Sequence, residues 1–297
     1  MALIELVCEL RHTSMASHYR EVRILPTIRL GIIVGLTEHP EEALGKVRDL
    51  NLPTCQLSCW KPDILTGAMA EKVKAASART GVEITTVWAG WSGPAVWNFY
   101  DGPLTLGLVP VTYRAQRIQD LKRASDFALM LGVDSITTHV GFLPEDPNDP
   151  SYREAIIALR EVAGYCNRNG QAFCFETGQE TPVTLIRTSN DIGLDNLGVN
   201  LDPANLLMYG KANPLDAMDI LGPYIKGVHA KDGEYPTCGE RLGVEKALGE
   251  GRVNFPALIK KLKHHGYQGA ITIEREISGP QQIKDIQRAQ ELLLPLL

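Results

Sequence analysis

The sequence predicts a single-domain α/β protein, a (β/α)8 or TIM barrel, that occupies residues 28–297. Two observations lead to this fold class. Eight short apolar runs are spaced along this part of the chain, and amphipathic stretches of helical period separate them. Strands and helices that alternate at this spacing indicate parallel strands with crossover helices. Eight such units close naturally into a barrel, and one barrel commonly fills a chain of this length.

The predicted strands are short and rich in apolar or β-branched residues. They span residues 28–36, 54–60, 82–91, 135–142, 172–178, 197–203, 225–232 and 269–276. Glycine follows three of the helical stretches, at Gly132, Gly170 and Gly266, where a helix is expected to end. The two longest connections, 91–112 and 233–254, each follow a strand. We therefore expect both at the C-terminal mouth of the barrel, as candidate lids over an active site.

The composition argues against two classes of partner. Hydrophobic residues make up 44% and charged residues 22%, which is typical of a globular protein with a sizeable core. The formal net charge of -5 gives no general attraction for a phosphate backbone, so no nucleic-acid partner is expected. The chain has no run of about 18 apolar residues, so no membrane-spanning helix is expected.

The cysteines and the N-terminal segment bear on localisation. The six cysteines form no Cys-X-X-Cys pair, and we interpret them as buried, reduced thiols, which indicates a cytoplasmic protein. Residues 1–27 lack the basic start, apolar stretch and small-residue cleavage site of a signal peptide. We interpret them as an N-terminal extension of unknown role, within which Met15 offers an alternative start.

The last four predicted strands share a pattern that points to chemistry. Side chains alternate between the two faces of a strand, so Phe173 and Phe175 face one way and their neighbours the other. In each of these strands one face is large and apolar, as packing against helices requires. The other face is small and polar and ends in an ionisable residue. These residues are Glu176, Asp202, His229 and Glu274. Four consecutive strands are thus expected to direct an ionisable group into the same space.

Three carboxylates and an imidazole cannot share a dry cavity without a counter-charge. A divalent cation would supply it, and oxygen-rich ligation with one imidazole suits Mn, Co or Mg, while Zn is also compatible. The alternative is that each of the four side chains is separately solvated or paired with a lysine or arginine at the rim. Their shared position at the strand ends favours the hypothesis of one metal site.

Several segments of the sequence resemble the xylose-isomerase-like TIM-barrel superfamily of sugar phosphate isomerases and epimerases. They are FETG, NLDPANLL, VHAKDG and LGEGRVNFPALIKKLKHHGYQGAITIERE, and the resemblance covers about residues 28–297. It implies that Glu176, Asp202, His229 and Glu274 are the metal ligands. In the ketose 3-epimerase branch the first and last glutamates are also the acid and base on opposite faces of the substrate. The resemblance thereby implies Glu176 and Glu274 as catalytic residues.

One departure from the superfamily pattern bears on the substrate. The DNA-repair endonucleases of the superfamily carry a second histidine three residues after the metal-binding aspartate, whereas this chain has Asn205. This difference and the acidic net charge both argue against a nucleic-acid substrate. Sugar epimerases often have histidine at the same place, in contact with a substrate oxygen. Asn205 can still form a hydrogen bond with a hydroxyl group.

Further residues are candidates for contact with a sugar. His139 ends the fourth predicted strand on its inward face, and Lys231 shares the inward face of His229; a hydrogen-bonded core residue is the alternative for His139. Arg241 lies in the loop after the seventh strand, where it either holds a polar group or is simply exposed. Trp88 belongs to a group of four tryptophans near the second and third strands, which either stack on sugar C–H surfaces or plug the barrel top.

The sequence therefore predicts a divalent-metal-dependent sugar isomerase or epimerase. It would act on a ketose or keto-sugar by proton transfer through a metal-stabilised enediolate. Two alternatives stay open. One is a lyase on the same barrel, similar to inosose dehydratases or deglycosidases, and the other is a non-catalytic sugar-binding barrel. The expected partner is a small-molecule sugar, and a homo-oligomer is compatible with the sequence.

Overall fold

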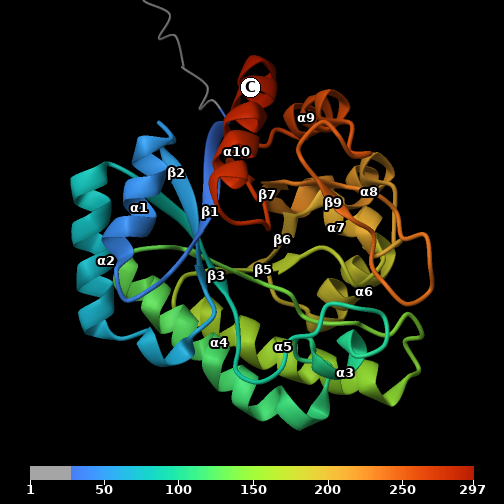
Figure 1. Ribbon diagram of the computed structural model, residues 1–297. Helices are drawn as coiled ribbons and strands as arrows, with labels where there is room; N and C mark the ends of the chain where they lie inside the picture. The colour runs from blue at the N-terminus through green and yellow to red at the C-terminus, as the bar shows by residue number, and fades with distance from the viewer. Residues whose placement is uncertain (1–27) are drawn as a thin grey trace, which may run out of the picture.

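The computed structural model describes residues 28–297 and forms one closed barrel of parallel strands inside a ring of helices (Figure 1). The predicted N-terminal extension, residues 1–27, lies outside the described residues. The order of strands around the barrel is β1-β10-β7-β6-β5-β4-β3-β2. The first and last strands pair directly, with Arg29 opposite Ala270 and Ile32 opposite Ile273, and this pairing closes the barrel.

All eight predicted strands are confirmed, with shorter bounds than the apolar runs. The barrel strands are β1 (Arg29–Gly35), β2 (Thr54–Cys59), β3 (Glu83–Ala89), β4 (Ser135–Thr138), β5 (Ala172–Glu176), β6 (Leu197–Leu201), β7 (Ile225–Ala230) and β10 (Ala270–Ile273). A small antiparallel hairpin, β8 (Asp232–Gly233) with β9 (Glu245–Lys246), was not predicted; it begins at the last residue of the predicted strand 225–232 and otherwise lies within the connection 233–254.

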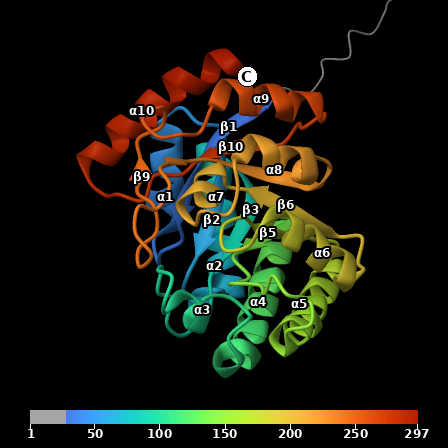
Figure 2. The same cartoon turned by 90° about the vertical axis from the view of Figure 1, so that its right-hand side faces the viewer.

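Helices follow the strands and cover the outside of the barrel (Figure 2). They are α1 (Pro40–Asp49), α2 (Gly67–Thr80), α3 (Gly102–Thr105), α4 (Val111–Leu131), α5 (Pro150–Arg168), α6 (Pro182–Ile192), α7 (Pro203–Met208), α8 (Pro214–Leu221), α9 (Phe255–His264) and α10 (Pro280–Leu293), with short 3-10 turns at Pro62–Ile64, Gly222–Tyr224 and Leu294–Leu296. The predicted stop at Gly132 is confirmed, because this residue caps α4 in the left-handed conformation. None of the helices described is long and apolar enough to span a membrane.

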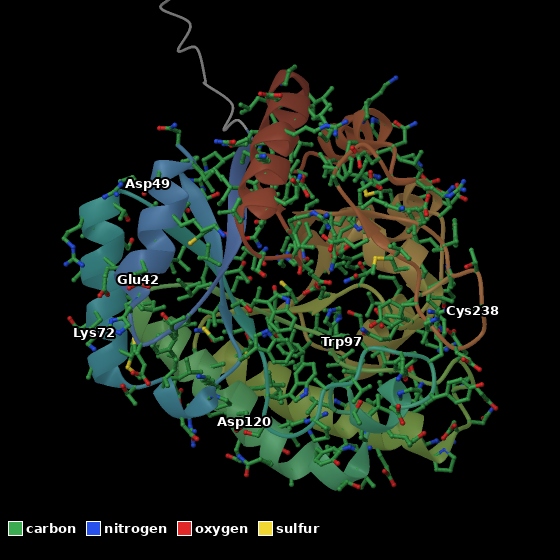
Figure 3. The ribbon with its side chains drawn as sticks, viewed as in Figure 1. Glu42, Asp49, Lys72, Trp97, Asp120 and Cys238 are labelled. Carbon is green, nitrogen blue, oxygen red and sulfur yellow. The ribbon has the colours of Figure 1, made fainter. Side chains whose placement is uncertain are left out.

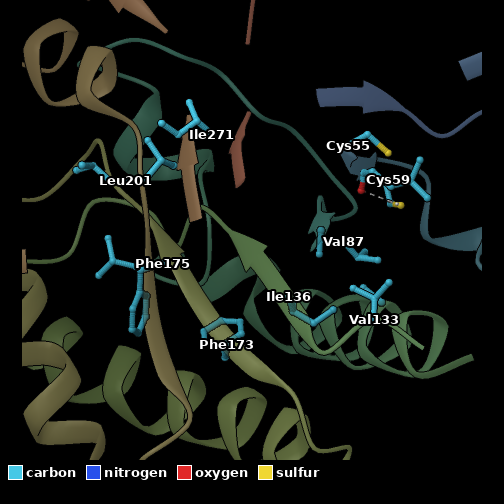
Figure 4. Close-up of a cluster of buried hydrophobic side chains, with 14 of the residues drawn as sticks. Cys55, Cys59, Val87, Val133, Ile136, Phe173, Phe175, Leu201 and Ile271 are labelled. Carbon is cyan, nitrogen blue, oxygen red and sulfur yellow. Dashed lines mark hydrogen bonds between the residues drawn. The ribbon is translucent and has the colours of Figure 1, made fainter. Parts of the chain in front are cut away.

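The hydrophobic core lies between the strands and the helices. Phe173 and Phe175 on β5 point outward toward the helices, as do Ile136 and Leu201 on neighbouring strands (Figure 4). This outward apolar face is the one that the alternation of β5 predicted. Four of the five cysteines described are buried, but Cys238 is exposed, so the expectation of buried thiols is wrong there, while Cys8 lies outside the described residues.

The connection after β3 is anchored to α4 by a buried arginine. The guanidinium of Arg117 donates to the carbonyl oxygens of Ser92 (3.1 Å), Pro94 (2.8 Å) and Gly107 (2.7 Å). Arg117 is fully buried, and this burial lowers its pKa to about 10. Gly107 has φ of 67°, and a Cβ there would lie 2.0 Å from the carbonyl carbon of Val140. The segment expected to be a lid is therefore held in one conformation by specific contacts.

We predict that Arg117→Met lowers the free energy of unfolding by about 2–4 kcal/mol, because buried carbonyl groups lose their donor. Urea denaturation followed by circular dichroism measures this change. The control is Arg123→Met on the same helix, whose side chain pairs at the surface with Asp63. For that variant we expect a change below about 0.5 kcal/mol. Equal destabilisation of the two variants would contradict the anchoring role of Arg117.

Candidate active site

The four ionisable residues predicted at the strand ends do meet at the C-terminal mouth of the barrel. Glu176 ends β5, Asp202 follows β6, His229 lies in β7 and Glu274 follows β10. One potential ligand atom from each residue lies within 4.8 Å of every other. All of these side chains except that of Glu274 are almost fully buried. The period of two along each strand therefore positions the side chains as the sequence indicated.

Local hydrogen bonds fix the carboxylate of Asp202. Its Oδ1 accepts from the backbone N–H of Asn205 (2.8 Å), which makes Asp202 the N-cap of α7. Its own backbone N–H donates to Oγ1 of Thr177 (2.8 Å), and that hydroxyl donates to the carbonyl oxygen of Asp202 (2.8 Å). One oxygen of the carboxylate is thus committed to the helix, and the other, Oδ2, is free to face the cluster.

Three buried atoms of the cluster have no hydrogen-bond partner: Oδ2 of Asp202, Oε2 of Glu274 and Nδ1 of His229. Nδ1 of His229 lies 2.8 Å from Oε2 of Glu274 and 3.6 Å from Oδ2 of Asp202. The contact with Glu274 does not form a hydrogen bond, and the contact with Asp202 is too long for one. Buried polar atoms without partners are costly, and a cation among them would satisfy all three at once. The residues present therefore fit a divalent metal ion, and the cluster could bind one.

A hydrogen-bonded relay of two amide side chains, those of Gln56 and Asn200, orients the imidazole of His229. Nε2 of His229 lies 2.9 Å from Oε1 of Gln56 on β2, and Nε2 of Gln56 donates to Oδ1 of Asn200 on β6 (2.9 Å). With the amide oxygen of Gln56 facing the ring, Nε2 of His229 carries the proton and Nδ1 faces the carboxylates. Gly227 makes room for the relay, because a Cβ there would lie 2.2 Å from Oδ1 of Asn200. Sequence reasoning missed Gln56, although it is a polar residue in an apolar strand.

The charges in the cluster compensate one another. Burial raises the pKa of Glu176, but His139 and His229 outweigh it, so the pKa lies below its usual value. Burial likewise raises the pKa of Glu274, and Lys231 and His229 bring it below its usual value. Burial lowers the pKa of Lys231, but Glu274, Glu276 and Asp202 raise it well above the ordinary value. Both glutamates are therefore ionised and the lysine charged near neutral pH.

A cavity of about 280 Å³ opens above the cluster. Its lining includes Glu176 and Glu274 together with four of the predicted substrate contacts. These four are Trp88, His139, Asn205 and Lys231. The indole N–H of Trp88 donates to Glu176, and Nε2 of His139 lies 3.5 Å from Oε1 of Glu176. The polar groups of the lining are thus coupled to the carboxylates of the cluster.

Arg241, the fifth predicted substrate contact, does not line this cavity. It is exposed in the loop between β8 and β9, and the next residue, Leu242, contributes to the lining instead. Cys238, three residues earlier, lies at the outer edge of the molecule, whereas Trp97 lies toward the middle (Figure 3). The path of an irregular loop has no sequence period, so nothing in the sequence indicated which of the two neighbours turns inward.

The lining also contains residues that sequence reasoning did not assign. Trp60 and Trp97 line the cavity beside Trp88, with ring centroids of Trp60 and Trp88 4.9 Å apart. Glu276 lines it too, and its Oε1 accepts from Nζ of Lys231 (2.8 Å). A signal for Glu276 was present, because it lies two residues after Glu274 and so shares its face in an extended segment.

Comparison with known proteins places the chain in a family. Residues 44–296 match the model of the family described as xylose isomerase-like TIM barrel. The chain belongs to this family. A crystal structure of a xylose isomerase domain protein from Planctomyces limnophilus is 34% identical, covers 91% of this chain and 98% of its own, and has a TM-score of 0.86. The predicted resemblance and fold class are thereby confirmed.

A curated relative is more distant. An uncharacterized protein of Methanocaldococcus jannaschii is 27% identical over 193 residues, which are 61% of this chain and 62% of that relative. The match therefore spans less than two thirds of that relative's length.

Other solved structures share the fold at low identity. The 3-keto-D-glucoside 4-epimerase from E. coli is 16% identical, with a TM-score of 0.68 over 91% of this chain and 100% of its own. A probable 3-DHS dehydratase from Bacillus anthracis is 16% identical with a TM-score of 0.64. A xylose isomerase-like protein from Mycobacterium smegmatis in complex with magnesium is 18% identical with a TM-score of 0.68. A sugar epimerase and a probable dehydratase thus share this barrel fold.

We predict that Gln56→Leu weakens the binding of Mg²⁺ or Mn²⁺ by about 10–100-fold, because the imidazole of His229 loses the acceptor that fixes its orientation. Isothermal titration of the purified protein with each ion measures the affinity. The control is Thr272→Val, since Thr272 is paired with His229 across β10 and β7 and its buried hydroxyl has no partner. Unchanged affinity in Gln56→Leu would show that the relay does not orient the histidine.

Proposed function

We propose that the protein is a divalent-metal-dependent sugar isomerase or epimerase that acts on a ketose or keto-sugar by proton transfer at the carbon beside the carbonyl. The observation that carries the proposal is the pair of ionised glutamates, Glu176 and Glu274, at the floor of one cavity. They come from strands separated by β6 and β7, with unpartnered atoms of Asp202 and His229 between them. The sugar epimerases among proteins of this fold support the same reading.

Glu176, Asp202, His229 and Glu274 would hold the metal ion, and Mn, Co or Mg suits this set of donors, while Zn is also compatible. When bound, such an ion polarises a carbonyl oxygen and stabilises the negative charge that develops on it. Asp202 and His229 would serve binding alone. Their remaining polar atoms are committed to the cap of α7 and to Gln56.

The two glutamates would carry the proton. Removal of a hydrogen beside a carbonyl at neutral pH needs a placed base in its ionised form, and the pKa of each glutamate is lowered. One carboxylate would accept the proton, and the other, on the far side of the substrate carbon, would return one to the opposite face and invert the centre. Transfer by one carboxylate on one face would instead give isomerisation without inversion.

The remaining lining would hold the substrate. Nζ of Lys231 donates to Oδ1 of Asn205 (3.4 Å) and so would orient the amide group of Asn205 toward a substrate hydroxyl group. The ring of His139 packs against two indole rings, with its centroid 5.7 Å from that of Trp88 and 5.2 Å from that of Trp97. These aromatic faces suit the apolar C–H surface of a sugar ring and exclude water from the reacting carbon.

We predict one divalent ion per chain, bound by the four ligand residues, and a loss of most bound metal in Asp202→Asn and His229→Ala. Elemental analysis after dialysis against Mn²⁺ measures the content. Asp219→Asn provides the control, because its carboxylate is exposed on α8 and pairs with Lys261. Wild-type metal content in Asp202→Asn and His229→Ala would refute the assignment.

We also predict that Glu176→Gln and Glu274→Gln each reduce turnover by roughly 10²–10⁴-fold, the usual contribution of a positioned acid or base. Both variants should keep the wild-type circular dichroism spectrum. Ketoses and 3-keto glucosides incubated with Mn²⁺-loaded protein in deuterated water, and followed by NMR, reveal an active substrate. The product should carry solvent deuterium beside the carbonyl.

The other outcomes of this experiment separate the alternatives. Product without deuterium would contradict transfer between two carboxylates. Loss of water or of an aglycone would assign the protein to the lyases, and binding without any conversion would identify a sugar-binding barrel. Glu250→Gln, which removes an exposed carboxylate paired with Arg288, should leave turnover unchanged.

A further inference from the structure

One charged pair in the cavity wall has no part in the proton transfer described above. Nζ of Lys231 lies 2.8 Å from Oε1 of Glu276, 3.6 Å from Oε2 of Glu274 and 3.8 Å from Oδ2 of Asp202. Lys231 is 3% exposed, so its ammonium group is enclosed by these carboxylates. A lysine held in this way is not free to bind an anionic group of a substrate.

The backbone of Glu276 is held firmly at the rim. Its N–H donates to Oε1 of Glu245 (3.0 Å), and Oε2 of the same Glu245 accepts from Arg275 (2.9 Å). Arg275 also contacts Asp285 of α10 (2.8 Å). The side chain of Glu276 is about half exposed, with 54% of its surface accessible, while it lines the cavity. Its carboxylate therefore occupies a fixed place at the entrance, where an incoming substrate meets it.

The charged residues that line the cavity are three glutamates and one lysine, and a bound divalent ion would offset the charges of Glu176 and Glu274, which leaves Glu276 as the carboxylate that the metal does not neutralise. Lys231 is the one lysine or arginine among the described lining residues. Recognition of a phosphate or carboxylate group normally uses a cation with free donors, most often arginine. Here the cation is already paired, and the pairing carboxylate would repel an anion.

The uncharged part of the lining is aromatic. Trp60 and Trp97 are 41% and 40% exposed, which leaves part of each ring available to a ligand. Both line the cavity beside Trp88, and their rings pack edge to face with centroids 6.3 Å apart. Such faces bind the C–H surface of a neutral sugar ring and offer no favourable contact to an anionic substituent.

Resting on the proposed function, we propose that the substrate is an uncharged, unphosphorylated keto sugar or keto glycoside, and that Glu276 is the residue that excludes anionic sugars. Glu276 acts in two ways. It keeps the ammonium group of Lys231 occupied, and it places its own negative charge at the entrance of the cavity.

The test compares matched neutral and phosphorylated ligands. The tryptophans of the cavity provide an intrinsic fluorescence signal, and the Mg²⁺-loaded protein is titrated with D-fructose, D-tagatose and the 6-phosphate of each. For the wild type we expect at least one neutral ketose to bind more tightly than its 6-phosphate, by a factor of about ten or more. In Glu276→Gln the phosphate should gain about tenfold in affinity while the neutral sugar changes little.

Two further variants keep the result interpretable. Glu276→Asp retains the charge and should retain the discrimination, whereas Glu240→Gln removes an exposed carboxylate of the loop between β8 and β9 that lies outside the lining and should change nothing. Because the effect is electrostatic, the discrimination should also shrink in about 1 M salt, where the Debye length is short.

The outcomes that overturn the proposal are distinct. If the phosphates bind the wild type as tightly as the neutral ketoses, or if Glu276→Gln leaves the ratio unchanged, this inference fails while the proposed function stands. If none of these sugars or their phosphates binds, and the 3-keto glucosides of the turnover experiment do not bind either, the proposed function fails and this inference fails with it.

Discussion

Three carboxylates gathered around one imidazole in a buried place are the constraint on which the rest of the site depends. Their mutual repulsion must be balanced, and the surroundings of the cluster meet that need in several ways. Lys231 and His139 lie beside the carboxylates, Trp88 donates to Glu176, and Oδ1 of Asp202 accepts a hydrogen bond at the start of α7. Oδ2 of Asp202, Oε2 of Glu274 and Nδ1 of His229 have no hydrogen-bond partner and face one another, and this set of atoms fits a cation.

The barrel makes this arrangement predictable from sequence. A strand buried on both faces alternates its side chains with a period of two, and the carboxyl ends of parallel strands meet at one mouth. The apolar residues Phe173 and Phe175 therefore fix the direction in which Glu176 points, and the same reasoning holds for Asp202 and His229. Fold class, strand order along the chain and the four ionisable residues follow from patterns within a few residues of one another.

Other features of the site depend on contacts between residues that are distant in sequence, and no local sequence pattern predicts such contacts. The contact of Gln56 with His229 joins residues 173 positions apart, and the relay also needs glycine at position 227. Arg117 is a polar residue on an amphipathic helix, and only the folded connection after β3 shows that its partners are three carbonyl groups. Leu242 lines the cavity in place of the predicted Arg241 for a similar reason. A loop has no regular side-chain period, so its sequence does not indicate which residues point into the cavity.

The anchoring of the connection after β3 has a consequence for the thermodynamics of ligand binding. Along the chain, Trp97 lies between Pro94 and Gly107, whose carbonyl groups accept hydrogen bonds from Arg117. This side of the cavity is therefore assembled when the chain folds. A ligand then meets a surface whose conformational entropy has already been lost, and binding does not have to oppose it again. A change in α4 that loosened the connection would weaken affinity through an entropic term, without altering any atom that touches the ligand.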